Sequence, residues 1–494
     1  MAVILRLVGR NNTKSAPGIL ATGNGTTPVS DAESRNHHET IANSGANGNY
    51  PDMKASRSLL PVLLAAITFS TFADTVKDRE GAVRNDRTTL ENDARWIYND
   101  FQKGFAEAKR TGKPLLVALR CIPCLACAGI DAQVLLQESD LTSLLDQFIC
   151  VRVINANALD LSLFQFDYDL SFATMFFNGD GTVYGRYGSW RHQKDAQDKT
   201  TAGFKRALEA ALTLHRGYPA NKNSLAGKQG VPLPFKTAVD IPTLSEKYTL
   251  DLNWDGKVVP SCVHCHQIGD ALRLTYRDKG KPIPEEWIYF WPAPETIGLT
   301  LSADHIARVE SVTSGSIAER AGLRPGDELT SLAGQPLISI ADASWALHRA
   351  PKTGSLAAVV KRDGGEKSLN IPLPADWRKK SDIARRVGTW PMRGMATGGL
   401  VLEDLTNEER SRRKLGDQGM ALFVKHVGQY GKHAAGKNAG FQKDDVIVQI
   451  AGQSKRITES ELIGQLLQEH QTGENVKATV LRGSERIELS MPMQ

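Results

Sequence analysis

Three cysteines that directly follow an apolar stretch constrain this chain more than any other feature. Residues 120–133 contain Cys121, Cys124 and Cys127, which form two overlapping Cys-x-x-Cys pairs. The run Leu115–Leu119 before them predicts a buried parallel strand, and the apolar residues after them have helical spacing. A dithiol at a strand-to-helix junction predicts a redox site.

The order of the three thiols along this junction predicts their roles. A helix N-terminus carries unpaired N–H groups and partial positive charge, which stabilise a thiolate. Cys124 is the first thiol that can lie at the helix start, so we assign it as the attacking thiol and Cys127 as the resolving thiol. Cys121 ends the strand, as a third redox thiol or a small buried residue. The alternative is a zinc site or three buried thiols, because closely spaced cysteine pairs also bind zinc.

Length and charge narrow the function classes. A chain of 494 residues is expected to hold about three domains. The formal net charge of +5 comes from 60 basic and 55 acidic side chains. This excess is too small, for a chain of this length, to indicate a nucleic-acid partner.

The first 73 residues predict an extension and an export signal. Residues 1–52 hold few large apolar side chains, so we expect them to be disordered. Residues 53–73 have a basic start, a short apolar run and a Thr-Phe-Ala end, which predicts a signal peptide cleaved after Ala73, with translation starting at Met53. The alternative is a buried core helix. The apolar run is shorter than the ~20 residues of a membrane span, so no span is expected in the mature chain. The signal peptide predicts that the mature chain is periplasmic or otherwise exported.

Residues 93–218 alternate between helical and strand patterns. Apolar residues from Trp96 to Ala108 recur at helical spacing and predict a helix before the cysteine-bearing strand. The elements predicted after the cysteines are a helix over 141–148, a strand over 149–154, a hairpin around Asn178–Gly181 and a helix with Phe204, Leu208 and Leu212. This order predicts a central sheet with helices on its faces.

The same order, with Cys-x-x-Cys opening the second helix, resembles the thioredoxin fold. The resemblance implies thiol–disulfide exchange. Thioredoxin-like proteins place a cis-proline before the hairpin strand, beside the dithiol, whereas here Ala173 precedes Thr174. In the thioredoxin fold this proline limits metal binding and shapes the substrate groove. Its absence here therefore affects the predictions of substrate exchange and of a site without metal. Cys150, on the predicted central strand, is expected to be a small buried residue.

A second cysteine motif lies in residues 219–292, a predicted linker whose first part is marked by proline and glycine. Cys262-Val263-His264-Cys265-His266 contains Cys-x-x-Cys-His, the covalent attachment signature of c-type haem. In that interpretation Cys262 and Cys265 form thioethers with the porphyrin and His266 ligates the iron, while the second axial ligand stays open. A plain disulfide or a zinc site is the alternative.

Two related segments follow. The stretch 321–335 recurs as 439–453, and two copies at that spacing predict two domains, over 293–376 and 394–494, rather than a solenoid. Each copy is expected among short strands, followed by a helix (341–348 and 459–469) and a terminal strand pair.

These segments resemble PDZ domains. In the first, Ile297, Gly298 and Leu299 fit the family's carboxylate-binding loop, whose backbone N–H groups capture a peptide C-terminus while the peptide adds a strand. In the second, Gly398 replaces the usual apolar residue. For either domain, a docking block without peptide binding is the alternative. The combination resembles a family of exported bacterial proteins that pair a thioredoxin-like domain with PDZ modules, some members carrying selenocysteine. Here every such position is cysteine.

The expected fold is therefore an α/β thioredoxin-like domain, then a haem-motif segment, then two mainly-β PDZ-like domains. The expected function is exported thiol–disulfide exchange by Cys124 and Cys127, with a c-type haem and with PDZ modules that bind protein clients. Clients with free C-termini or disulfides and an electron-transfer partner are the expected partners. The alternatives are a PDZ scaffold with structural disulfides and a haem electron carrier without thiol activity.

Overall fold

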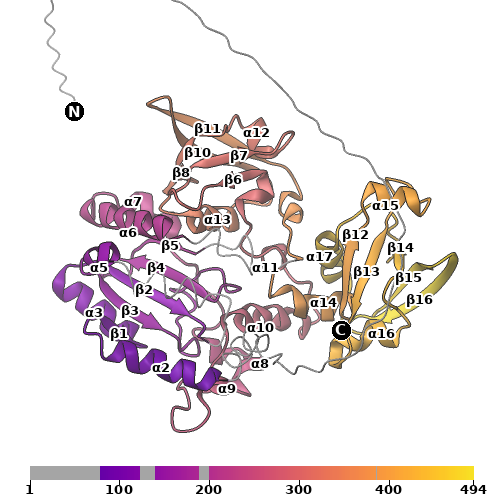
Figure 1. Ribbon diagram of the computed structural model, residues 1–494, viewed down its shortest axis with the longest axis horizontal. Coiled ribbons are helices and arrows are strands. Elements are labelled where there is room, and N and C mark those ends of the chain that lie inside the picture. Colours follow the sequence, from indigo (N-terminus) through magenta and orange to yellow (C-terminus); the bar gives the residue numbers. More distant parts are fainter. Residues whose placement is uncertain (1–77, 123–138, 189–199, 385) are drawn as a thin grey trace, which may run out of the picture. The chain divides into compact units, whose positions relative to one another are not determined.

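The computed structural model describes residues 78–122, 139–188, 200–384 and 386–494 (Figure 1), which all belong to the unit Ile67–Gln494. The predictions for residues 1–73 fall outside this range, as do the side chains of Cys124 and Cys127. Among the described helices, none has the length and apolar character needed to cross a membrane.

A five-stranded sheet organises the N-terminal α/β domain (Figure 1). Its order is β1-β3-β2-β4-β5, with β1, β3 and β2 parallel and with β4 and β5 antiparallel to their neighbours. The strands are β1 (Trp96–Tyr98), β2 (Leu115–Arg120), β3 (Ile149–Val153), β4 (Phe172–Phe177) and β5 (Val183–Tyr187). The hairpin of β4 and β5 confirms the predicted turn at Asn178–Gly181.

Successive residues of β2 point to opposite faces of this sheet, and each face carries its own hydrophobic core. Leu115, Val117 and Leu119 pack on the face that α3 covers, whereas Leu116 and Ala118 pack with α5 and α6 on the other. The helices in the described part of this domain are α2 (Arg79–Glu91), α3 (Phe101–Thr111), α5 (Ser139–Leu145) and α6 (Thr201–Arg216). Burial on both faces explains why β2 reads as an uninterrupted apolar run.

The start of α3 corrects one sequence prediction. The prediction that this helix begins at Trp96 is wrong, because Trp96–Tyr98 forms strand β1, parallel to β3. The helix begins at Phe101, where the Asp100 carboxylate accepts a hydrogen bond from the Lys103 N–H at 2.8 Å. An N-cap of this kind stabilises the first turn and fixes where the helix starts.

The segment predicted as a linker packs onto the α/β domain. Its helices are α7 (Lys222–Leu225), α8 (Pro242–Ser245), α9 (Val258–Ser261), α10 (Cys265–Arg277) and α11 (Glu285–Ile288). Ile241, Val263 and Ile268 are fully or almost fully buried, in the core that also contains Val117 and Leu119 of β2. The second cysteine motif therefore lies against the sheet and not on a separate tether.

Two sheet-rich regions follow the α/β domain. In the first, the sheet order is β11-β10-β8-β9, with a separate pair β6-β7. Its elements are β6 (Leu299–Leu301), β7 (Val309–Val312), α12 (Ile317–Arg320), β8 (Glu328–Leu332), β9 (Gln335–Pro336), α13 (Ile340–His348), β10 (Gly354–Arg362) and β11 (Gly365–Leu373). The helix and the terminal strand pair agree with the prediction for the first copy.

The second region has one sheet, in the order β12-β13-β14-β15-β16. Its elements are α14 (Thr389–Thr397), β12 (Leu400–Asp404), α15 (Asn407–Arg412), β13 (Leu422–Val427), α16 (Ala435–Asn438), β14 (Val446–Ile450), α17 (Glu459–Glu469), β15 (Asn475–Arg482) and β16 (Glu485–Pro492). Short 3₁₀ turns lie at Ala226–Lys228, Ala238–Asp240, Pro294–Ile297, Trp377–Lys380 and Gly431–Ala434. Helix α17 has the predicted bounds.

One ion pair recurs in both regions and supports the internal repeat. Arg362 donates to both carboxylate oxygens of Asp327 and to the carbonyl oxygen of Gly322. Arg482 donates in the same way to Asp445 and to the carbonyl oxygen of Gly440. Each arginine therefore ties the terminal strand pair of its region to the repeated turn.

Helix α13 of the first region packs against the edge strand β5 of the α/β domain. The buried side chains of Lys228 and Asp342 form an ion pair at 2.6 Å, with exposed fractions of 0% and 1%. Asp342 also accepts a hydrogen bond from the Arg186 N–H at 3.1 Å. The Arg186 guanidinium lies 4.0 Å from the ring centroid of Trp345. These contacts explain why β5 is buried although it is the edge strand.

The last residue of α13, His348, gives the fold a predicted pH dependence. Burial, with nearby Arg378 and Arg349, lowers the pKa of His348 to about 3. The unfolded chain binds a proton near pH 6.5, so stability is lost as pH falls below that value, by about 2 kcal/mol between pH 6.5 and 5. Denaturant unfolding across this range should show a smaller loss in His348→Gln than in the wild type. An unchanged slope in the variant would contradict the prediction.

Candidate functional site

Cys121 lies at the end of the central strand β2. Its N–H donates to the carbonyl oxygen of Ser171 at 2.9 Å, which continues the pairing between β2 and β4. The guanidinium of Arg120 contacts the carbonyl oxygens of Cys121 and Ser171. The strand pairing therefore fixes the backbone of Cys121, and Arg120 places a positive charge at the same strand end.

His264 of the second cysteine motif faces Cys121. The Cys121 Sγ atom lies 3.1 Å from the Nδ1 atom of His264, across 143 positions of sequence. His264 precedes helix α10, and its N–H donates to the Oε1 atom of Gln267 at 2.8 Å, which holds the residue at the helix start. The two cysteine motifs that the sequence presents separately thus meet in one place.

The surroundings of His264 favour its neutral form. Burial is the largest cause that lowers the pKa of His264, and the charges of His266 and Arg79 act in the same direction. In the tautomer protonated at Nε2, the neutral ring accepts a proton at Nδ1, the atom nearest the Cys121 thiol. A neutral imidazole beside a thiol is the arrangement of a general base that activates a cysteine.

Asn157 holds the backbone of the second motif. Its side chain is fully buried, and its Oδ1 atom accepts a hydrogen bond from the Val263 N–H at 2.7 Å. Its amide nitrogen donates to the carbonyl oxygens of Ser261 and Thr249 at 2.8 and 2.7 Å. No pattern in the sequence singles out Asn157, because its role depends on a loop about a hundred residues away.

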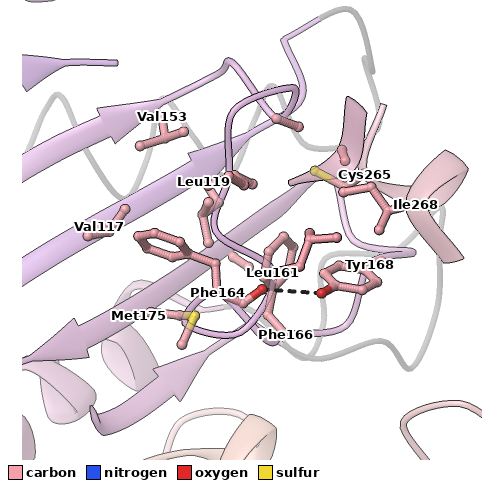
Figure 2. Packing of buried hydrophobic residues seen from close by; sticks show 14 of the residues in the cluster. Val117, Leu119, Val153, Leu161, Phe164, Phe166, Tyr168, Met175, Cys265 and Ile268 are labelled. Atoms are coloured by element: carbon pink, nitrogen blue, oxygen red, sulfur yellow. Dashed lines mark hydrogen bonds between the residues drawn. The ribbon is translucent and has the colours of Figure 1, made fainter. Parts of the chain in front are cut away.

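The thiols of the second motif lie beside the strand ends. The Cys262 Sγ atom lies 3.4 Å from the carbonyl oxygen of Ile154, and burial raises the pKa of Cys262 to about 11. Cys262 carries no disulfide bond. Cys265 and Ile268 of α10 belong to the same buried core as Leu119 (Figure 2).

Cys121, Cys262 and Cys265 line one small apolar cavity. Its volume is about 20 Å³, and its other walls come mainly from valine, leucine and isoleucine side chains. A space of this size has room for about one water molecule. Residues of both cysteine motifs therefore border the same small space.

This cavity also tests the haem interpretation. A haem would have to bond both Cys262 and Cys265, yet these thiols border a space of about 20 Å³. Pockets that hold organic ligands usually have about 300–1,000 Å³. The residues in this arrangement therefore do not leave room for a haem at the two thiols, and haem attachment stays a prediction for a direct measurement.

The predicted iron ligand His266 points along α10. Its Nδ1 atom lies 3.5 Å from the carboxylate of Asp270, one turn later on the same helix. Within the described part of the chain, no group of three or more His, Cys, Asp or Glu side chains has the geometry of a metal site.

Cys150 behaves as the sequence predicts. It lies on β3, is almost completely buried, and burial raises its pKa to about 12. Such a thiol is chemically inert at neutral pH. Cys150 therefore serves as an internal control for the reactivity of the other cysteines.

The predicted peptide-binding residues surround the start of strand β6. Gly298 has a φ of 79°, and an added Cβ atom would lie 2.2 Å from the Cβ atom of Ser316, so glycine is required there. Ile297 and Leu299 point into the core of their own region. A ligand at this loop would therefore meet backbone groups and not these two side chains.

Two family models match parts of the chain. Residues 96–179 match a model described as thioredoxin-like, and residues 308–362 match a PDZ domain model. The chain thus contains a thioredoxin-like domain and a PDZ domain. The search of curated protein sequences found no match.

Solved structures show a similarity that is limited in extent. The HtrA-type protease AlgW with a decapeptide has 18% sequence identity and a TM-score of 0.19, over 28% of this chain and 40% of that chain. A point variant of the same protease, also with a decapeptide, has 18% identity and a TM-score of 0.18 over the same shares. The match thus spans less than half the length of these proteases.

Proposed function

We propose that this protein is an exported thiol–disulfide oxidoreductase that binds its protein clients through its PDZ region. The observation that carries the proposal is the contact of 3.1 Å between the Cys121 Sγ atom and the Nδ1 atom of His264. A cysteine paired with a histidine, at the end of the central strand of a thioredoxin-like domain, is suited to thiolate chemistry.

In the proposed reaction, a thiolate attacks a disulfide of the client and forms a mixed disulfide. Cys124 is the proposed attacking thiol and Cys127 the resolving thiol, because of their positions in the Cys-x-x-Cys motif. Cys121 is the proposed third redox thiol at the end of this strand, with His264 as its base and with the positive charge of Arg120 beside it. The first step, attack by Cys124, releases one thiol of the client. The second step, attack by Cys127 on the mixed disulfide, releases the other.

The PDZ domain, which lies in the first sheet-rich region, binds the client in this proposal. Strand β6 pairs with β7 along one edge, and an extended peptide adds to the other edge while backbone N–H groups near Gly298 hold its carboxylate. Export accounts for the signal-like residues 53–73 and places the thiols where protein disulfides persist. Haem attachment is tested by the intact mass of protein expressed with an export and haem-attachment system.

A trapping experiment tests the proposed function. In Cys127→Ser, the mixed disulfide with a client cannot be resolved, so client adducts should accumulate on non-reducing gels, whereas Cys124→Ser should form none. Cys150→Ser is the matched control and should behave as the wild type, because Cys150 is buried. If Cys127→Ser forms no adduct with disulfide-containing proteins, the scaffold alternative is favoured.

A further inference from the structure

The position of Cys262 relative to Cys121 follows from the pairing of two neighbouring strands. Strands β2 and β3 are parallel, with Leu119 beside Val153. Cys121 comes two residues after Leu119, and the Cys262 Sγ atom contacts the carbonyl oxygen of Ile154, the residue after Val153. Neighbouring strands lie about 4.8 Å apart, so Cys262 reaches the sheet at the strand end that carries Cys121.

Two further observations place the two side chains together. Cys121 and Cys262 line the same apolar cavity of about 20 Å³. Cys262 and Ile122, the residue after Cys121, also pack in one hydrophobic cluster with Ile154 and Val258. A disulfide needs Cα atoms about 4.4–6.8 Å apart, and the shared cavity is the space that a Cys121–Cys262 bond would cross.

We propose that Cys121 and Cys262 form a reversible disulfide that links the two cysteine motifs. This pair deepens the proposed function, on which it rests, because it gives the thioredoxin-like domain a second redox couple. Cys265 is the less suitable partner, since its side chain packs in the core with Leu119 and Ile268 (Figure 2).

The reaction balances with a disulfide as the oxidant. Cys121 attacks oxidised glutathione, its proton passes to His264, and the first glutathione thiolate leaves and takes up that proton. The Cys262 sulfur then loses its proton as it attacks the Cys121 sulfur, and the expelled second glutathione thiolate takes up this second proton. Two thiols of the chain become one disulfide, and two electrons pass to the oxidant, which ends as two thiols.

Disulfide mapping of the full chain tests this pair. The reduced protein is treated with oxidised glutathione, free thiols are alkylated, and the digest is analysed without reductant. A peptide that links Cys121 to Cys262 is expected. In Cys121→Ser, alkylation of Cys262 should rise by about tenfold or more, and in the control Cys150→Ser the linked peptide should persist.

A second variant removes ambiguity among neighbouring cysteines. With Cys124, Cys127 and Cys265 all replaced by serine, a disulfide between the two motifs can only join Cys121 to Cys262. Full alkylation of Cys262 in this folded variant, at every glutathione concentration, would overturn the inference. A link from Cys121 to Cys265 in the wild type would overturn it as well.

The same samples separate this inference from the proposed function. If client proteins are trapped through Cys124 while Cys262 stays fully alkylated, the proposed function stands and the inference fails. If the Cys121–Cys262 link forms but no client is trapped or reduced, the inference stands and the proposed function fails.

Discussion

Replacing Asp342 with alanine is expected to lower the free energy of unfolding by about 3–5 kcal/mol, because it leaves a buried cation unpaired. Lys228 is completely buried and has the Asp342 carboxylate 2.6 Å away. The same carboxylate accepts hydrogen bonds from the N–H groups of Arg186 and Ile338. The substitution therefore removes one partner from a buried ion pair and from two backbone donors at once.

Denaturant unfolding followed by tryptophan fluorescence measures this effect, since Trp345 lies in the same contact. Asp376→Ala is the matched control: its carboxylate pairs with Lys379 at the surface, with an exposed fraction of 65%, and surface ion pairs contribute little. Equal unfolding midpoints for Asp342→Ala and Asp376→Ala would contradict the role given to Asp342.

Replacing Arg386 with methionine is expected to have an effect of similar size, about 3–5 kcal/mol. Its guanidinium contacts the buried carboxylates of Asp167 and Asp169, with 2.8 Å between its Nε atom and Asp169. Burial raises the pKa of Asp167 to about 6 even beside Arg386. Without the arginine the two carboxylates would remain buried as a like-charged pair.

The pH dependence of this variant distinguishes loss of charge from loss of packing. The destabilisation should be larger near pH 8, where Asp167 is ionised, and smaller near pH 5, below its pKa of about 6, where Asp167 is protonated at little cost. Arg110→Met removes an exposed ion pair with Glu107 and should leave unfolding unchanged. A destabilisation of Arg386→Met that does not vary with pH would point to packing alone.

Strands β2 and β3 and helices α6 and α17 could be predicted from the sequence, because burial gives each of them a regular apolar pattern. The apolar run at β2 is visible in the sequence since both faces of the sheet are covered. The predicted start of helix α3 was wrong because Trp96 and Ile97 also fit helical spacing. A strand of three residues is too short to show the alternation of buried and exposed side chains that identifies a strand. The cap at Asp100 is the local signal that separates the two.

The candidate site was predictable only in part. Cysteine spacing identified both motifs, but no sequence pattern shows that His264 meets Cys121, because that contact depends on how the segment after the α/β domain packs. Asn157 and Asp342 could not be predicted for the same reason. Their roles depend on burial beside partners that are distant in the sequence.

The packing of α13 on β5 limits which parts of this chain can be separated by gene rearrangement. A gene rearrangement that carried away residues 93–218 alone would separate Arg186 from Asp342 and Trp345. It would also uncover the outer edge of β5, and an open strand edge invites pairing with other chains. We therefore expect related proteins to retain the first sheet-rich region and the α/β domain together.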